Sequence, residues 1–226
     1  MTTDTRPVRR RDDLPSVARL LTVSDNVVAI ALTLLALQVK VPSLDQVANP
    51  DSAAALAAEL AKEAGQLISY LVAFYVIAQF WLTHHRVFRH LADHDEGLAW
   101  WNFAFLFTIT AIPFTSSLLG QYSNNPLAVD IFAVNLLLAT LATRMILLYG
   151  RRRDLLAGTI DPRAVRALRA RAAGMVVIVA LSVSLAWVNT SIAKDCWLLI
   201  PLVQWAAERW SAHAPSAKAA AAPPGQ

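Results

Sequence analysis

The most constraining feature of this chain is the apolar segment RLLTVSDNVVAIALTLLALQVKVP, which runs from Arg19 to Pro42. It is long enough to cross a bilayer as one helix, because a hydrocarbon core of about 30 Å takes about 20 helical residues. It nevertheless carries Ser24 and Asp25 in its first turns. A carboxylate at that depth is costly unless it is paired or faces water, so an intramembrane aspartate by default marks a functional site.

The aliphatic and polar side chains of this segment point in different directions. At about 100° per residue, Ile30, Leu34 and Leu37 share one stripe of the predicted helix. Thr33 lies at the edge of this stripe, whereas Asp25 points elsewhere. We therefore expect the helix to present an aliphatic face to one partner and a hydrogen-bonding patch to another.

The composition is that of an integral membrane protein. The chain has 226 residues, of which 56% are hydrophobic and 16% charged, and its mean hydropathy is +0.45. The single Cys196 cannot form an internal disulfide. The first apolar run is too long for a signal-peptide core, so we expect it to be retained. The formal charge of +4 comes from arginines beside apolar segments, which indicates membrane topology rather than nucleic-acid binding.

The hydropathy pattern predicts an all-α protein with six transmembrane helices. These cover residues 17–41, 66–87, 98–119, 126–149, 172–189 and a short sixth segment, 194–207. The Ala-rich stretch 51–65 is expected to extend the second helix upstream, with Ser52 as part of its cap. The predicted organisation is a cytoplasmic arm (1–15), a single six-helix domain (16–210) and a disordered, low-complexity cytoplasmic tail (211–226).

The distribution of arginines predicts the orientation of these helices. Arginines gather before the first predicted span, after the second, between the fourth and fifth, and after the sixth, as Arg6, Arg9, Arg10, Arg11, Arg86, Arg89, Arg151, Arg152, Arg153, Arg163, Arg166, Arg169, Arg171 and Arg209. The opposite connections hold few basic residues. Because basic residues accumulate on the cytoplasmic side, both termini are predicted to be cytoplasmic.

Several polar side chains fall at a similar depth near the cytoplasmic ends of the first three spans. We expect Ser24 and Asp25 to bond to Trp81, His85 or Asn102 and so to hold the first helix against the second and third. Buried polar groups need such partners. The alternative left open by the residues is that the two adjacent histidines only sit at the membrane interface, as amphipathic rings often do.

Other kinds of site find little support. His90 and His94 are four residues apart with Asp93 and Asp95 nearby, but no cysteine or distant histidine completes a metal site. No metalloprotease or serine-hydrolase motif is present, so we predict neither an enzyme nor a bound cofactor. Two alternatives to a channel stay open. One is a transporter, although the internal repeats that many transporters have are not visible here. The other is a structural protein in which the aliphatic stripe is only a packing face.

The first helix resembles the prokaryotic branch of the TMEM175 family, lysosomal-type potassium channels whose hallmark is Arg-x-x-x-Phe-Ser-Asp. The hallmark reads here as Arg19, three residues, then Val23, Ser24 and Asp25. The similarity continues through WLTHHRVFRHL and WWNFAFLFTITAIPFTSSLLGQY, and so covers roughly the first three helices. Val23 replaces the usual Phe, which we expect to alter local packing.

The resemblance implies a homotetramer in the bacterial plasma membrane, in which the first helix of each subunit lines a central pore. It implies conduction that favours potassium without a carbonyl filter, in line with the lack of a Thr-Val-Gly-Tyr-Gly loop. The implied hydrophobic constriction and threonine layer fall on Ile30, Thr33, Leu34 and Leu37, and the implied inter-helix polar network on Arg19, Ser24, Asp25, Trp81, His85 and Asn102.

The alternative function is a proton-permeable channel or a proton-coupled transporter that uses Asp25 and His85 as a relay. Besides potassium ions and the bilayer itself, anionic lipid is a candidate partner for the Arg-rich segments at the cytoplasmic face. Nucleic acid is not expected.

Overall fold

The structure, a computed structural model, describes residues 16–43, 45, 47, 49, 51–158, 162–200, 202, 203, 205, 206 and 209. Within these residues the chain is all-helical, as predicted. The helices are α1 Val17–Ala36, α2 Ala53–Lys62, α3 Ala64–Phe88, α4 Glu96–Gln121, α5 Pro126–Arg152, α6 Pro162–Ala186 and α7 Thr190–Asp195, followed by the 3-10 helix η2 Cys196–Leu199. The predicted arm and tail lie outside the described residues.

Five helices in the described part of the chain are long and apolar enough to cross a membrane: α1, α3, α4, α5 and residues 165–186 of α6. The predicted sixth span, 194–207, includes the end of α7 and all of η2, and several of its later residues lie outside the described part. The structure therefore supports five spans by length and composition, and the sixth stays a prediction.

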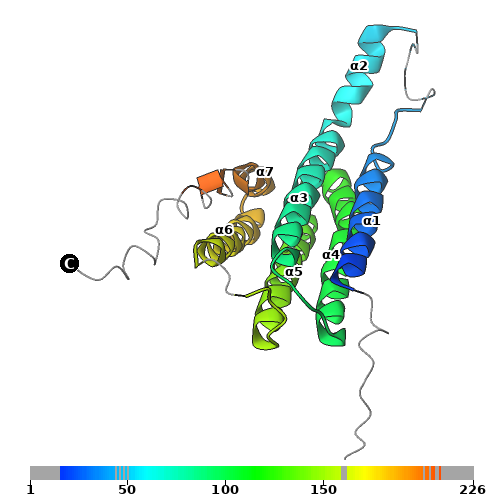
Figure 1. Ribbon diagram of the computed structural model, residues 1–226. Coiled ribbons are helices and arrows are strands. Elements are labelled where there is room, and N and C mark those ends of the chain that lie inside the picture. Colours follow the sequence, from blue (N-terminus) through cyan, green and yellow to red (C-terminus); the bar gives the residue numbers. More distant parts are fainter. Residues whose placement is uncertain are drawn as a thin grey trace, which may run out of the picture.

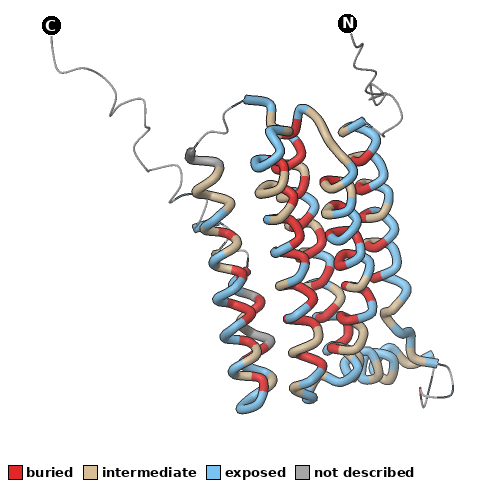
Figure 2. The backbone as a smooth tube through the Cα atoms, turned by 90° about the horizontal axis from the view of Figure 1, so that it is seen from below, coloured by how far each residue is buried: buried red, intermediate tan, exposed pale blue. Residues whose placement is uncertain are grey.

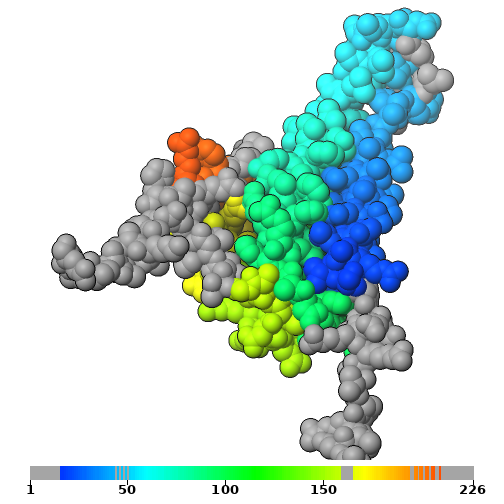
Figure 3. Space-filling model, viewed as in Figure 1, coloured from blue at the N-terminus to red at the C-terminus, as the bar shows by residue number. Residues whose placement is uncertain are grey.

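The long helices pack as a bundle in which α4 is central. Helices α1, α3 and α5 all contact α4, while α6 packs on α5 and α7 on α6 (Figure 1). The buried positions follow the inward-facing sides of α3, α4 and α5 (Figure 2). The core between α4 and α5 is apolar, with Phe105, Ile109, Phe132 and Leu136 fully buried. Helix α1 forms an outer edge of the bundle (Figure 3).

Local sequence explains where the helices begin. The side chains of Ser16, Ser52 and Asp95 accept hydrogen bonds from first-turn backbone amides of α1, α2 and α4. Asn125 caps α5 in the same way, and Pro126 is its first residue. These are preferred capping residues, and proline suits a first turn because its missing N–H has no helical partner.

Two predicted helix boundaries were wrong. Helix α1 ends at Ala36 rather than at Val41, because the chain turns at residues 37–39 and the backbone amide of Lys40 donates to Gln66 Oε1 on α3 at 3.1 Å. Helix α6 begins at Pro162 rather than at Ala172, because its arginine-rich first turns continue the helix out of the predicted membrane span instead of forming a loop.

Two connections at the same end of the bundle pair with each other. The amide of Ala92, between α3 and α4, donates to the carbonyl of Leu155 at 2.9 Å, and the amide of Ala157 donates to the carbonyl of His90 at 2.9 Å. Nearby, the Tyr149 hydroxyl donates to Asp95 Oδ2 at 3.0 Å. This paired segment, residues 90–92 with 155–157, fixes the start of α4 relative to the end of α5.

Candidate functional site

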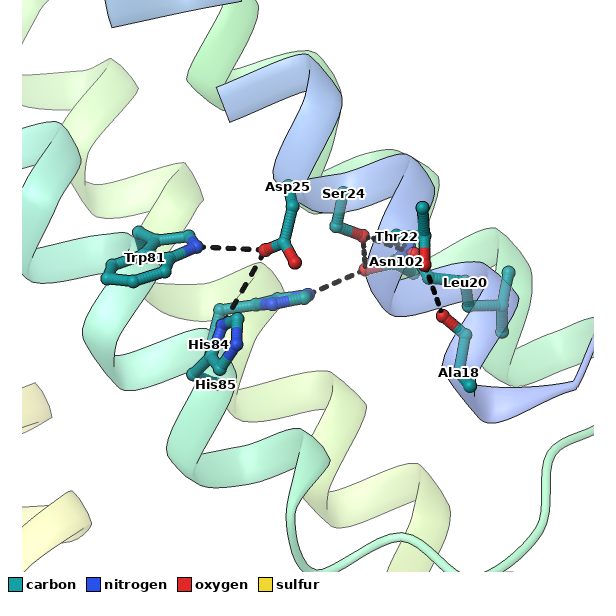
Figure 4. A network of polar contacts seen from close by, with 9 residues as sticks. All are labelled: Ala18, Leu20, Thr22, Ser24, Asp25, Trp81, His84, His85 and Asn102. Atoms are coloured by element: carbon teal, nitrogen blue, oxygen red, sulfur yellow. Dashed lines mark hydrogen bonds and ion pairs between the residues drawn. The ribbon is translucent and has the colours of Figure 1, made fainter. Parts of the chain in front are cut away.

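A buried polar triad joins α1, α3 and α4. Asn102 of α4 donates through Nδ2 to Ser24 Oγ of α1 at 2.9 Å, and its Oδ1 lies 2.8 Å from His84 Nε2 of α3 (Figure 4). Ser24 Oγ also lies 2.8 Å from the carbonyl oxygen of Leu20. All three side chains are fully or almost fully buried. Buried polar groups of this kind are satisfied by one another, which fixes the rotation of α1 against its neighbours.

His84 is held by aromatic rings as well as by Asn102. Its ring stacks on Phe88 of the same helix with centroids 4.2 Å apart, and on Phe105 of α4 at 4.6 Å with an interplanar angle of 12°. Sequence reasoning placed its neighbour His85 in the network and missed His84. The signal was present, because His84 continues the buried stripe of Ile77 and Phe80 along α3.

A second, more open group lies beside the triad. Trp81 Nε1 donates to Asp25 Oδ1 at 2.9 Å (Figure 4). The same oxygen lies 3.7 Å from His85 Nδ1, which is beyond hydrogen-bond distance but close enough for an ion pair when the histidine is protonated. The Asp25 and His85 side chains are 40% and 32% exposed. This group joins α1 to α3 at the surface of the subunit rather than in its core.

The structure thus brings together five of the six residues expected in the polar network. The five come from α1, α3 and α4 and are Ser24, Asp25, Trp81, His85 and Asn102. Arg19 is exposed, and among the described residues no hydrogen bond or ion pair joins its side chain to this cluster. It lies five residues, more than one helical turn, before Ser24 on α1.

The opposite face of α1 is open along its length. Ile30, Leu34 and Leu37 are 58%, 43% and 81% exposed, whereas Val28 and Leu35 on the inward face are buried. Thr33 is also exposed, and its hydroxyl donates to the carbonyl of Ile30 at 2.8 Å. The four residues expected at a constriction therefore share one outward stripe, three of them on α1 and Leu37 directly after its end, at the C-cap.

Five long apolar helices, with a polar cluster buried between three of them, define an integral membrane protein of the all-α class. Residues 19–113 match the sequence model of a family described as the endosomal/lysosomal potassium channel TMEM175. A potassium channel of Streptomyces collinus is 31% identical over 184 residues, which cover 79% of this chain and 86% of that protein. The chain belongs to the TMEM175 family, whose members are ion channels and not enzymes.

Other relatives match over shorter stretches. A potassium channel of Chamaesiphon minutus is 34% identical over 110 residues, 49% of this chain and 52% of that protein. The endosomal/lysosomal proton channel TMEM175 of Danio rerio is 30% identical over 134 residues, 58% of this chain and 24% of that protein. The match thus spans about half of the first relative's length and about a quarter of the second's.

The fold has a counterpart among solved structures. The crystal structure of a lysosomal potassium-selective channel TMEM175 homologue from Chamaesiphon minutus superposes with a TM-score of 0.68 at 22% identity. The match covers 84% of this chain and 97% of that one, so the two share a fold. Every residue of the polar cluster and of the outward α1 stripe lies within the stretch 19–113 that matches the family model.

Proposed function

We propose that this chain is the subunit of a homotetrameric, potassium-favouring cation channel in the bacterial plasma membrane. Each subunit contributes six transmembrane helices, with residues 194–207 in the sixth, and both termini are cytoplasmic. The α1 helices of four subunits line a central pore. The observation that carries the proposal is the outward stripe of Ile30, Thr33, Leu34 and Leu37, an open aliphatic face on a helix whose other face is buried.

Four copies of Ile30 around an axis would form a narrow apolar ring. Such a ring resists ion passage because a partly dehydrated cation finds no replacement ligands there, and water itself leaves a tight hydrophobic constriction. A small outward tilt or rotation of α1 then suffices to wet the ring. The ring serves as the gate, with Leu34 and Leu37 extending it along the pore.

The same stripe accounts for a modest preference for potassium. The Thr33 hydroxyl donates its proton to the Ile30 carbonyl, so its oxygen lone pairs are left to face the open side of the helix. A ring of such oxygens offers weak cation ligands, and a hydrophobic ring favours the ion that sheds water more easily, which is potassium rather than sodium. Neither effect is strong, since no carbonyl-lined filter is involved.

The polar cluster acts on the pore indirectly. The bonds of Ser24 to Asn102 and of Asp25 to Trp81 turn one face of α1 toward its own subunit, which leaves the Ile30 face outward. In this proposal Asp25 positions the helix and does not touch the permeating ion.

The deciding experiment compares two substitutions on equally open aliphatic positions. Ile30→Asn is expected to raise basal potassium flux into proteoliposomes by at least about tenfold, equivalent to about 1.4 kcal/mol of barrier, because the ring becomes wettable. Val177→Asn is the matched control, since Val177 is 56% exposed on α6. Unchanged flux in the Ile30 variant, or an equal rise in the control, would argue against Ile30 as the gate.

Proton permeation is the second candidate, and the open Asp25 and His85 pair is the observation in its favour. A carboxylate 3.7 Å from an imidazole within a span has the composition of a proton relay. Under this alternative, His85→Phe abolishes pH-driven proton flux into liposomes but spares potassium flux. Under the potassium-channel proposal, the two fluxes change together.

A further inference from the structure

A groove opens between α3, α5 and α6, on the far side of the subunit core from the polar cluster. It is open to its surroundings, and Figure 1 shows the three helices that border it. Its walls combine arginines with apolar and hydroxyl side chains from all three helices.

Helical spacing explains why one groove gathers these residues. On α5, Arg144, Leu147, Leu148 and Arg151 follow the i, i+3, i+4, i+7 pattern of a single helix face. On α6, residues 165, 168, 169 and 172 repeat the same pattern. Two helix faces with the same spacing, each carrying apolar residues and arginine, therefore lie opposite each other across the groove.

The groove is strongly cationic for a membrane-level site. Four of its lining residues are arginines, Arg144, Arg151, Arg169 and Arg171, and none is acidic. Arg144, Arg151 and Arg169 are exposed, whereas Arg171 is buried, with 7% of its surface accessible. Arg144 and Arg151 are two helical turns, about 10 Å, apart along α5. Arg144 alone lies within a predicted span, 126–149, where a positive charge is costly unless an anion or water faces it.

The floor of the groove is apolar. Phe80, Leu147, Leu168 and Met175 contribute hydrocarbon surface. The hydroxyls of Thr140 and Thr143 donate to carbonyls of their own helix, at 2.9 and 2.8 Å, so their protons are not free for a ligand. A ligand in this groove therefore meets cationic donors at its rim and hydrocarbon below.

The geometry points to an anionic phospholipid of the cytoplasmic leaflet as the occupant of this groove. Its phosphate would lie against the rim guanidinium groups, which match phosphate oxygens in a bidentate way, and an acyl chain would cover Phe80, Leu147 and Met175. Basic pockets between transmembrane helices on this side of a membrane suit such headgroups. A free phosphate would satisfy only the rim. The inference is independent of the pore, because no residue of α1 takes part.

The test measures lipid retention by the purified full-length protein. Native mass spectrometry after exchange into micelles doped with phosphatidylglycerol or phosphatidylcholine gives the two affinities separately. We expect Arg144→Gln/Arg169→Gln to weaken phosphatidylglycerol binding by about tenfold or more, since the change removes two of the basic side chains that face the anionic headgroup. Phosphatidylcholine binding is expected to stay unchanged.

The matched control is Arg89→Gln/Arg152→Gln, which removes the same charge from exposed positions outside the groove. An equal loss in this control would mean that the effect comes from general surface charge, and would overturn the proposal. Displacement of the lipid by inorganic phosphate alone would also overturn it, because the groove would then be a site for free anions. Ala172→Phe tests the acyl part, because it narrows the floor and keeps all four arginines; undiminished lipid binding in this variant contradicts the proposal.

A labelling experiment keeps the proposal testable if the double variant fails to fold. Phosphatidylglycerol with a photoreactive acyl chain, used on the unmodified protein, is expected to label peptides of α5 and α6 that contain residues 147–148 and 168–175. Labelling confined to other helices, or labelling that phosphatidylcholine competes away equally well, would rule the groove out as an anionic-lipid site.

Discussion

The two faces of α1 differ in where their partners lie. The inward face, with Ser24 and Leu35, has partners from α3 and α4 within the same chain. Two close hydrogen bonds reach this side of α1, one from Asn102 to Ser24 and one from Trp81 to Asp25. The outward face, with Ile30, Leu34 and Leu37, is open in the single subunit. One helix thus carries both the side chains that hold it against its own chain and an open aliphatic face.

This difference separates stability from conduction in an experimentally useful way. Substitutions on the inward face should change the stability of the fold, and substitutions on the outward face should change ion permeation. The inward and outward residues nevertheless lie within a few positions of each other along α1. The following predictions test that separation, in order of decreasing expected effect.

Replacing Asn102 is expected to be the most damaging change. Asn102→Leu removes the partner of His84 and leaves that ring buried between Phe88 and Phe105 without its hydrogen bond. We expect a loss of about 2 kcal/mol in the free energy of unfolding, measured as a lower thermal midpoint in detergent. Asn26→Leu on the outward face of α1 is the control and should change stability by less than about 0.5 kcal/mol. Comparable losses of stability in both variants would show that the two faces of α1 do not differ in their contribution to folding.

Removing the carboxylate of Asp25 should destabilise the protein less than Asn102→Leu does, and the expected consequence is impaired assembly. Asp25→Ala deletes the acceptor of the Trp81 bond at 2.9 Å, worth about 1 kcal/mol. The expected result is a lower yield of tetramer by size-exclusion chromatography, with the potassium-to-sodium permeability ratio of the remaining channels unchanged. Asp25→Asn keeps an acceptor for Trp81 and should restore much of the yield. Normal yield with altered selectivity would instead place Asp25 in the ion path.

The smallest expected effect is on selectivity. Thr33→Val removes the oxygen on the outward stripe and should change the potassium-to-sodium permeability ratio by about two- to fivefold, equivalent to about 0.5–1 kcal/mol. Bi-ionic recordings in planar bilayers measure this ratio. Thr110→Val on α4 is a close control, because Thr110 is exposed and its hydroxyl donates to a carbonyl three residues earlier, as that of Thr33 does. Equal shifts of the permeability ratio in the two variants would mean that the Thr33 hydroxyl does not contribute specifically to ion selectivity.

Much of this fold was predictable because membrane-spanning helices can be recognised in a sequence by their length and hydropathy. The end of α1 was not, since it depends on Gln66 of α3 accepting a bond from Lys40, which no local pattern encodes. The start of α6 was placed too late because the arginines between the fourth and fifth predicted spans were left outside the fifth span, although a helix can extend beyond the bilayer with its charges in water.

For the site, the partners of Ser24 and Asp25 could be anticipated from depth alone, as the bonds to Asn102 and Trp81 illustrate. Which of two adjacent histidines faces Asn102 could not be read from depth, because neighbouring residues on a helix point about 100° apart. The buried stripe of α3 selects His84. Arg19 was predicted in the cluster because it occupies the hallmark position of the sequence. In the structure its side chain is exposed, so sequence position alone did not predict its contacts.

The paired segment between residues 90–92 and 155–157 bears on how this protein can be modified. Surface connections usually tolerate inserted residues, but here an insertion beside Leu91 would shift the hydrogen bonds to Leu155 and from Ala157 out of register. Asp95 would then lose its place opposite Tyr149. Fluorescent reporters or affinity tags introduced in either connection would disturb both, so the two have to be engineered as a single unit.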